Sequence, residues 1–383
     1  MNRLIIKNGQ VITPENVLKN TTIIVENGRI KQIGGNFSFS PSDHVIDAAD
    51  QMIAPGFIDL HIQGAGGADI LDATPEAVRT IAKTCARYGV TGFLATTKCF
   101  PQADNTHLTI AAEFEGNLSG SAELLGIHIE GPFISPKRLG MIQIDNVSSP
   151  SMDFLRELNE LCREKLRMMT IAPEIEGNRE LIENLVRMDI IPSFGHSDAS
   201  YDETVKGFEY GIRHVTHLYN AMRSIHHRDP GPVPAIFDKD NVIAQVICDG
   251  AHIHPSVIRF TLNELGGKRF VLITDGMNAL GLPDGTYRYD ALEFSSIDGI
   301  ARYHDGRLMG TATSMNILIK RCIEFTNFPL STVINAASLI PAQVLGIDKR
   351  KGSLEIGKDA DIVILNEDFS VWKTIIAGTV VHE

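Results

Sequence analysis

The chain has 383 residues, of which 43% are hydrophobic and 21% charged, and its formal net charge is −12. This length favours one large domain plus a smaller one, and the composition is typical of a globular protein. The acidic balance argues against a nucleic-acid-binding protein, because a phosphate backbone requires a basic face. It does not exclude a phosphorylated small molecule, since one arginine and a few backbone amides can hold a single phosphate.

The five cysteines are widely spaced and include no C-x-x-C pair. Their odd number and spacing predict free thiols in a reducing compartment, rather than disulfides or a thiolate zinc site. No apolar run resembles a signal peptide or approaches the length needed to cross a membrane. The sequence therefore predicts a cytoplasmic protein.

Residues 1–54 consist of short β-type runs separated by turns. Asn8-Gly9 and Asn27-Gly28 follow such runs, and Asn-Gly between β-type segments is a strong hairpin signal. No helical periodicity occurs in this region. We therefore expect a small antiparallel β unit.

From Pro55 onward, β-type runs alternate with helical ones. Eight strands are predicted, at residues 57–61, 90–97, 124–130, 168–172, 190–196, 214–217, 242–248 and 270–275. Helices are expected between them, for example at residues 75–88, 152–164, 178–188 and 254–265. Such alternation indicates parallel strands with helical crossovers, and eight units fit a (β/α)₈ barrel. The lack of G-x-G-x-x-G after the first strand counts against an open dinucleotide-binding sheet.

The last quarter of the chain first leaves this pattern and then returns to β texture. Residues 280–310 are rich in turns and predict a hairpin or extended loop, and helical runs at 314–325 and 331–345 would close the barrel. The tail is expected to pack on the N-terminal β unit. The predicted fold is thus α/β: a (β/α)₈ TIM-like barrel at residues 55–345, with a small β-sandwich domain from residues 1–54 and 346–383.

Ionisable side chains recur where the predicted barrel strands end. Glu130, His196, His217 and Asp275 each end a separate strand. Catalytic groups of such barrels gather at the carboxyl ends of the strands, so these four side chains are expected to converge. Packing alone does not explain ionisable residues at so many strand ends.

Two imidazoles and a carboxylate are suitable ligands for zinc or another divalent first-row ion. Such an ion lowers the pKa of a bound water to about 7 and polarises a carbonyl oxygen, which predicts a metal-dependent hydrolase. A second carboxylate would then act as general base. The spacing does not tell which of Glu130 and Asp275 is the ligand and which is the base.

The strand-end motifs occur in an order that resembles a known family. Residues 55–61, P-G-F-I-D-L-H, are similar to the opening strand of the amidohydrolase superfamily, whose usual form is H-x-H. Within it, H-I-E-G-P-F at 128–133, H-L-Y-N-A-M at 217–222 and T-D-G-M at 274–277 resemble the N-acetylglucosamine-6-phosphate deacetylases. The segment 352–361 also matches the closing β segment of the superfamily, so the resemblance extends over nearly the whole chain.

The resemblance implies hydrolysis of N-acetylglucosamine 6-phosphate to glucosamine 6-phosphate and acetate. It assigns Glu130, His196 and His217 as metal ligands, and Asp275 as the group that passes a proton to the departing amine. The substrate contacts that it implies are Met141, Asn220, Ala221, Arg228, His252, Leu308, Met309 and Gly310. Arg228 would bind the phosphate, for which a planar guanidinium is well suited.

The sequence departs from the family pattern at two positions. Gln63 stands where members with two metals have a second histidine, so we expect one tightly held ion and only a weak second site at His61 and Gln63. Ile142 stands where many deacetylases have a histidine that polarises the amide carbonyl, and isoleucine cannot donate a hydrogen bond. Either Gln143 or the metal alone would then polarise it.

Several alternatives remain open at this stage. The missing histidine leaves room for N-acetylgalactosamine 6-phosphate or another N-acyl amino sugar as substrate. A cyclic-amide hydrolase of the same superfamily would need neither Arg228 nor a phosphate, and a non-catalytic sugar-phosphate binder would not need the metal ligands. The resemblance favours zinc, with iron or another ion as alternatives, and implies a homodimer in which residues can cross into the neighbour's phosphate pocket.

Overall fold

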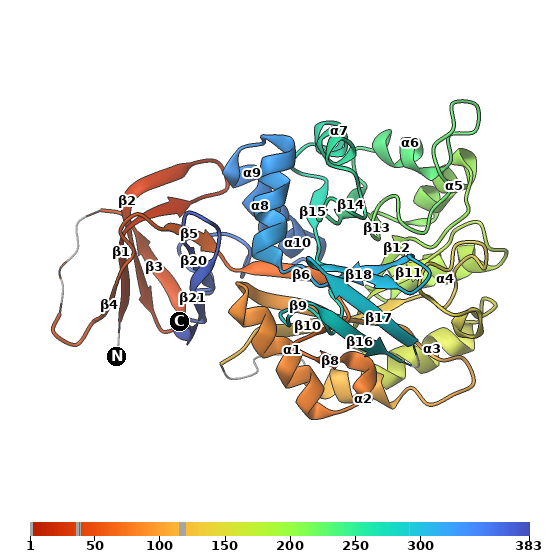
Figure 1. The fold of residues 1–383 in the computed structure, drawn as a ribbon, viewed down its shortest axis with the longest axis horizontal. Helices are drawn as coiled ribbons and strands as arrows, with labels where there is room; N and C mark the ends of the chain where they lie inside the picture. The colour runs from red at the N-terminus through yellow and green to blue at the C-terminus, as the bar shows by residue number, and fades with distance from the viewer. Residues whose placement is uncertain (1–2, 36–37, 39, 115–119, 291) are drawn as a thin grey trace.

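The computed structural model describes residues 3–35, 38, 40–114, 120–290 and 292–383. Figure 1 shows a small β domain that contains both chain ends, beside a larger body in which helices surround a parallel sheet. This is the predicted architecture. The domain boundaries after residues 54 and 345 remain predictions from the sequence.

Strands from both ends of the chain form the sheet of the small domain. Its order is β22-β21-β20-β5-β1-β2-β3, with β4 also paired to β1. The strands are β1 (Leu4–Ile12), β2 (Val17–Glu26), β3 (Arg29–Ile33), β4 (His44–Asp47), β5 (Met52–Pro55), β20 (Ile362–Leu365), β21 (Val371–Ile376) and β22 (Thr379–His382). β20 pairs antiparallel with β5, and Ile53 and Ile364 lie in the buried core there. The predicted turn between β2 and β3 has positive φ at Asn27 and Gly28, the conformation that Asn-Gly adopts most easily.

Eight parallel strands form the barrel sheet, in the order β15-β14-β13-β12-β11-β10-β9-β6. They are β6 (Phe57–Ile62), β9 (Val90–Thr97), β10 (Glu123–Glu130), β11 (Leu166–Ile171), β12 (Ile191–Phe194), β13 (His214–Val215), β14 (Ile243–Val246) and β15 (Phe270–Leu272). All eight predicted strands are present, although several are shorter than predicted. The chain order of the strands is also their order around the sheet, as expected for a (β/α)₈ barrel.

The seam between the first and last barrel strands is closed by one buried carboxylate. Asp59 Oδ1 accepts hydrogen bonds from the backbone N–H groups of His61 and Thr274, and Asp59 Oδ2 accepts one from Thr274 Oγ1 at 2.5 Å. A backbone bridge joins Ile62 to Gly276, and Asp275 N donates to His61 O. Burial raises the pKa of Asp59 to about 6, partly offset by these hydrogen bonds. The seam thus fixes His61 next to Asp275.

Helices follow the barrel strands and cover the outside of the sheet (Figure 1). They are α1 (Pro75–Arg87), α2 (Thr106–Glu113), α3 (Met152–Leu161), α4 (Asn178–Arg187), α5 (Tyr201–Tyr210), α6 (Pro232–Phe237), α7 (Pro255–Leu265), α8 (Met315–Thr326), α9 (Leu330–Ala336) and α10 (Leu339–Val344), with 3₁₀ turns at Ile70–Asp72 and Ile144–Asn146. None of the helices in the described ranges is both long and apolar enough to span a bilayer.

The prediction of one helix over residues 331–345 was wrong, because the chain forms α9 and α10 with a break at Ala337-Ser338. Pro341 explains the break, since a residue without an N–H is tolerated in the first turn of a helix and not in its interior. Ala337 O, released from the helix, accepts a hydrogen bond from Ile58 N of β6. The break therefore supports the first barrel strand.

The turn-rich segment after the eighth strand is neither a simple hairpin nor an extended loop. It is an antiparallel four-stranded sheet of β16 (Gly285–Tyr289), β17 (Leu292–Ile297), β18 (Ile300–Tyr303) and β19 (Leu308–Thr311). A further short pair, β7 (Gly64–Ala65) and β8 (Ala68–Asp69), follows β6. Lys98 Nζ, at the end of β9, pairs with Asp290 Oδ2 at 2.8 Å and ties the four-stranded sheet to the barrel.

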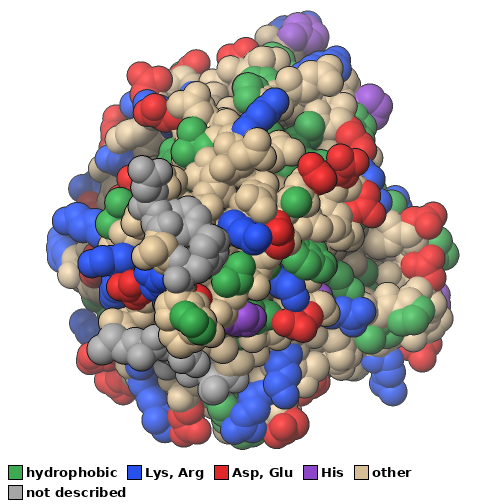
Figure 2. Space-filling view, turned by 90° about the vertical axis from the view of Figure 1, so that its left-hand side faces the viewer, with side chains coloured by type: hydrophobic (Ala, Val, Ile, Leu, Met, Phe, Trp, Pro, Cys, Tyr) green, Lys and Arg blue, Asp and Glu red, His purple; other side chains and the backbone are tan. Residues whose placement is uncertain are grey.

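The surface seen from the side of the small domain has no single sign of charge. Figure 2 shows acidic and basic side chains interspersed on this face.

We expect Asp59→Ala to destabilise the fold strongly. The substitution leaves two backbone N–H groups and the Thr274 hydroxyl without their acceptor, and each buried unsatisfied group costs about 1–3 kcal/mol. Urea denaturation should show a free energy of unfolding lower by at least about 3 kcal/mol. Asp153→Ala is the control, because Asp153 is 95% exposed and pairs with Arg156 on the same helix. If both variants were as stable as the parent, Asp59 would not hold the seam.

Candidate metal centre and active site

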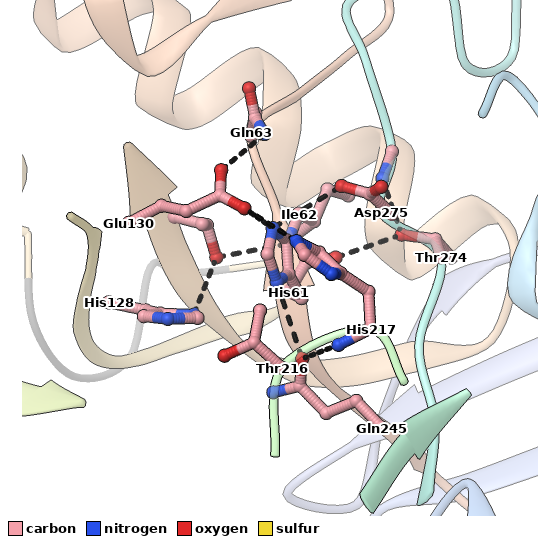
Figure 3. A network of polar contacts seen from close by, with 12 residues as sticks. His61, Ile62, Gln63, His128, Glu130, Thr216, His217, Gln245, Thr274 and Asp275 are labelled. Atoms are coloured by element: carbon pink, nitrogen blue, oxygen red, sulfur yellow. Dashed lines mark hydrogen bonds and ion pairs between the residues drawn. The ribbon is translucent and has the colours of Figure 1, made fainter. Parts of the chain in front are cut away.

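The four candidate catalytic side chains gather at the carboxyl end of the barrel. Glu130 is the last residue of β10, and His196, His217 and Asp275 follow the ends of β12, β13 and β15. Figure 3 shows Glu130, His217 and Asp275 pointing toward His61, which comes from β6. The predicted convergence is therefore present in the structure.

Three potential ligand atoms lie in mutual contact. Glu130 Oε1 is 3.0 Å from His196 Nε2 and 2.9 Å from His217 Nε2, and the two Nε2 atoms are 3.1 Å apart. All three side chains are buried, at 5% exposure or less. The set of Glu130, His196 and His217 could hold one metal ion.

The protonation pattern of these groups fits a bound cation. His196 Nδ1 lies 2.9 Å from Arg138 O, a pure acceptor, so the neutral ring has its proton on Nδ1 and a lone pair on Nε2. That lone pair faces the carboxylate oxygen of Glu130. A tetrahedral ion with ligands at about 2.1 Å separates its ligand atoms by about 3.4 Å and an octahedral ion by about 3.0 Å, so the observed spacing of 2.9–3.1 Å is closer to that around an octahedral ion. The residues present thus fit the expected metal.

The backbone is strained where the chain leaves three of the strands. His196, His217 and Asp275 have φ values of 48°, 26° and 48°, in the left-handed region that non-glycine residues seldom occupy. Conformations of this kind cost about 1–3 kcal/mol each and persist only where the surroundings enforce them. Here they coincide with the residues that converge on the centre.

His61 lies beside the three ligands and between two carboxylates. His61 Nδ1 is 3.3 Å from Gln245 Oε1, while His61 Nε2 is 3.3 Å from Asp275 Oδ1 and 3.7 Å from Glu130 Oε1. Burial lowers the pKa of His61, but the charges of Glu130 and Asp275 outweigh this effect and raise it to about 9. Burial likewise raises the pKa of Glu130, but the nearby charge of His61 is among the effects that outweigh it and hold this pKa well below its ordinary value.

The side-chain amide of Gln63 contacts the metal centre through its N–H group, and its carbonyl oxygen makes no hydrogen bond to the described residues. Its Nε2 donates to Glu130 Oε2 at 3.2 Å and contacts Met141 Sδ at 3.7 Å, while its buried Oε1 has no partner among the described residues. Gln63 therefore orients the carboxylate of Glu130. Its role in a second, weak metal site stays a prediction.

A pocket of about 270 Å³ opens above this centre. The predicted ligands, Asp275 and most of the predicted substrate contacts line it. The lining residues are Glu130, Gly140, Met141, His196, His217, Asn220, Ala221, His252, Asp275, Arg307, Leu308, Met309 and Gly310. Among the predicted substrate contacts, only Arg228 lies outside it, on an exposed loop where its Nη1 is 2.6 Å from His227 Nε2.

Two elements outside the barrel strands shape the pocket wall. His252 is held by Asp249, whose Oδ2 lies 2.6 Å from His252 Nδ1, so the other ring nitrogen is left for the pocket. Leu308, Met309 and Gly310 come from β19, which is fixed because Thr311 N donates to Asp275 O. At Gly310, with φ of 77°, a Cβ would lie 2.6 Å from Asp275 O, so only glycine allows this approach.

Arg307 and Gly140 are the pocket residues that the sequence reasoning missed, and Arg307 is the charged one. It is the only Lys or Arg among the described residues that line the pocket, and it precedes the predicted Leu308-Met309-Gly310 segment. Its Nε donates to Asp305 Oδ2 at 2.7 Å, and its guanidinium lies 5.4 Å from the Tyr303 ring centre. The available signal was its position next to a matched motif.

Neither Ile142, which replaces the carbonyl-polarising histidine, nor Gln143, which was considered for its role, is among the residues that line the pocket. Ile142 is buried, and Gln143 is exposed, with its Nε2 3.4 Å from Met141 O. In this structure Gln143 does not supply the missing hydrogen bond.

Comparison with known proteins agrees with this geometry. The sequence profile described as the amidohydrolase family matches residues 52–381. The chain belongs to the amidohydrolase family. It is accordingly a hydrolytic enzyme, and metal dependence is characteristic of this superfamily.

The relatives of this amidohydrolase include deacetylases of amino-sugar phosphates. An N-acetylglucosamine-6-phosphate deacetylase of Bacillus subtilis is 35% identical over 98% of this chain and 96% of its own. An N-acetylgalactosamine-6-phosphate deacetylase of Escherichia coli O157:H7 is 32% identical over 86% of this chain and 87% of its own. A variant N-acetyl-D-glucosamine-6-phosphate deacetylase of Mycobacterium smegmatis, solved in complex with N-acetyl-D-glucosamine-6-phosphate, superposes with a TM-score of 0.92 at 28% identity and full coverage of both chains.

We expect Glu130→Gln to lose most of its bound metal. A neutral amide oxygen is a weaker ligand than a carboxylate, and Glu130 Oε1 contacts both histidine nitrogens. Elemental analysis of the purified variant and the parent should show this difference. His227→Ala, an exposed histidine outside the pocket, is the control and should retain the parental metal content. Unchanged metal in Glu130→Gln would contradict the assignment.

Proposed function

We propose that this enzyme removes the acetyl group from N-acetylglucosamine 6-phosphate and releases glucosamine 6-phosphate and acetate. The observation that carries the proposal is the convergence of Glu130, His196, His217 and Asp275 on one side of a pocket sized for a small molecule. The similarity to deacetylases over nearly the full chain supports the substrate class.

In this proposal Glu130, His196 and His217 hold the metal, with zinc favoured over iron or another first-row ion. A divalent ion held there supplies a water of lowered pKa and polarises the amide carbonyl, a role that neither Ile142 nor Gln143 is placed to take. The second site at His61 and Gln63 is proposed to bind an ion weakly, because the carbonyl oxygen of Gln63 is a poorer ligand for a borderline-soft ion than an imidazole nitrogen.

Asp275 is proposed to accept the proton of the attacking water and deliver it to the departing amine. Its carboxylate lines the pocket, and Oδ1 lies 3.3 Å from His61 Nε2. The backbone of Asp275 is fixed on both sides, by Asp275 N to His61 O and by Thr311 N to Asp275 O. This arrangement holds the carboxylate still while it transfers the proton.

The remaining pocket residues are proposed to bind the sugar phosphate. Met141, Leu308, Met309 and Gly310 would contact the acetyl group and the ring, and Asn220, Ala221 and His252 the phosphate side. Arg307 is the cation that the chain itself contributes to the pocket. Arg228 is proposed to act in the pocket of a second copy in a homodimer, because it is exposed and outside its own pocket.

Two finer points belong to the same proposal. N-acetylgalactosamine 6-phosphate is the alternative substrate, supported by the Escherichia coli relative of that name. A reducing cytoplasm is proposed as the site of action, in keeping with the five cysteines, all free and buried.

We expect Asp275→Asn to keep its metal and lose turnover. The amide cannot accept a proton, and general acid–base catalysis contributes about 10²- to 10⁴-fold. The rate of acetate release and the metal content should be measured on the same sample. A variant that hydrolyses substrate at near the parental rate would disprove the role of Asp275.

We also expect the 6-phosphate to matter through the two arginines. Arg307→Ala and Arg228→Ala should each raise KM for the phosphorylated sugar by about tenfold, because a charge-assisted contact is lost, and should change KM for the unphosphorylated sugar little. Assays with the two hexosamine epimers, each with and without phosphate, separate the deacetylase from a cyclic-amide hydrolase. Equal activity without the phosphate would contradict the proposed substrate class.

A further inference from the structure

The loop after β10 contacts both the metal centre and the pocket. Arg138 O, in this loop, accepts the hydrogen bond from His196 Nδ1 at 2.9 Å. Two residues further along, a Cβ on Gly140 would lie 3.1 Å from the imidazole of His196, and Gly140 and Met141 line the pocket. The same loop therefore orients a proposed metal ligand and forms part of the substrate wall.

The segment after His196 is anchored to the barrel on its other side. Glu174, which follows β11 and is largely buried, accepts hydrogen bonds from Ser197 Oγ and from Asp198 N, both at 2.7 Å. Both carboxylate oxygens are used, so Asp198 has a fixed position relative to the strand ends.

Arg138 connects the loop to this fixed point. Arg138 Nε and Nη2 both lie within 2.9 Å of Asp198 Oδ1. Lys137 Nζ reaches the other oxygen, Asp198 Oδ2, at 3.3 Å, but Lys137 is 76% exposed and its carbonyl does not bond to His196. Arg138 is thus the residue whose side chain is held by Asp198 and whose backbone carbonyl holds His196.

We propose that Arg138 and Asp198 form a clasp that positions the imidazole of His196 for metal binding, through the backbone carbonyl of Arg138. Both are positioning residues, since neither lines the pocket. Partners that fix the tautomer and direction of a histidine ligand typically contribute 10- to 100-fold to metal affinity. The inference rests on the proposed metal site, and it adds the reason why His196 Nε2 points at that site.

The direction in which Arg138→Ala changes the Zn²⁺ affinity distinguishes a positioning role from a purely electrostatic one. Removing the positive charge of Arg138 near a cation site should strengthen cation binding if only Coulomb's law acted. If the clasp positions His196, the same substitution weakens binding. Lys137→Ala removes an equal charge from the adjacent residue without loosening the carbonyl, so it is the matched control.

The experiment titrates Zn²⁺ into metal-depleted full-length protein in competition with a chromophoric chelator. We expect Arg138→Ala and Asp198→Asn each to raise the Zn²⁺ dissociation constant about 10-fold or more, and the double variant to lose no more than either single one, because both break one unit. Arg138→Lys should recover part of the affinity, and Lys137→Ala should stay within about twofold of the parent. The melting temperature of each metal-free variant, together with far-ultraviolet circular dichroism, reports whether the fold is intact.

Unchanged or tighter Zn²⁺ binding by folded Arg138→Ala would overturn the clasp, as would additive losses in the double variant or an equal loss in Lys137→Ala. Should Arg138→Ala fail to fold, Arg138→Gln, which also removes the positive charge but keeps most of the side-chain length, takes its place, because Asp198→Asn removes a negative charge and would weaken cation binding by Coulomb's law as well. A parent protein that binds no Zn²⁺ would instead contradict the proposed metal site itself, so the two failures are distinguishable.

Discussion

The structure is organised around a contact between three side-chain atoms that could together bind one metal ion. A carboxylate oxygen and two imidazole nitrogens, from Glu130, His196 and His217, lie within about 3 Å of each other in a buried site. With the proton of His196 on Nδ1, its Nε2 lone pair repels the carboxylate oxygen at this distance in a medium of low dielectric constant. A divalent ion bound between the three atoms would remove this repulsion. The surrounding structure holds the three atoms close enough for an ion to bind without large rearrangement.

The barrel makes this possible because its strand ends lie in a ring. Each ligand leaves its strand within two residues, and left-handed backbone conformations turn His196 and His217 inward. Asp59 closes the seam that sets His61 against Asp275, and β19 packs its glycine against the carbonyl of Asp275. Hydrogen bonds around the centre therefore maintain its strained backbone conformations.

The strands and the converging residues could be predicted from the sequence, because both produce a local pattern of apolar runs that end in ionisable residues. Glu130, His196, His217 and Asp275 end apolar runs, and the order of those runs is also their order around the barrel. Other features were missed because a local signal was passed over, as at Pro341 and Arg307, or because they depend on contacts between distant residues. Pro341 divides a helix that periodicity joins, Arg307 enters the pocket through the folding of a four-stranded sheet, and the pairing of Arg138 with Asp198 spans 60 residues.

The central claim is that three scattered side chains share one cation. Diffraction from crystals of the Zn²⁺-loaded protein, recorded on both sides of the zinc absorption edge, tests it most directly. We expect a strong anomalous peak within bonding distance of Glu130 Oε1, His196 Nε2 and His217 Nε2. A fully loaded protein whose zinc peak lay elsewhere, with these three side chains bonded only to protein or water, would contradict it.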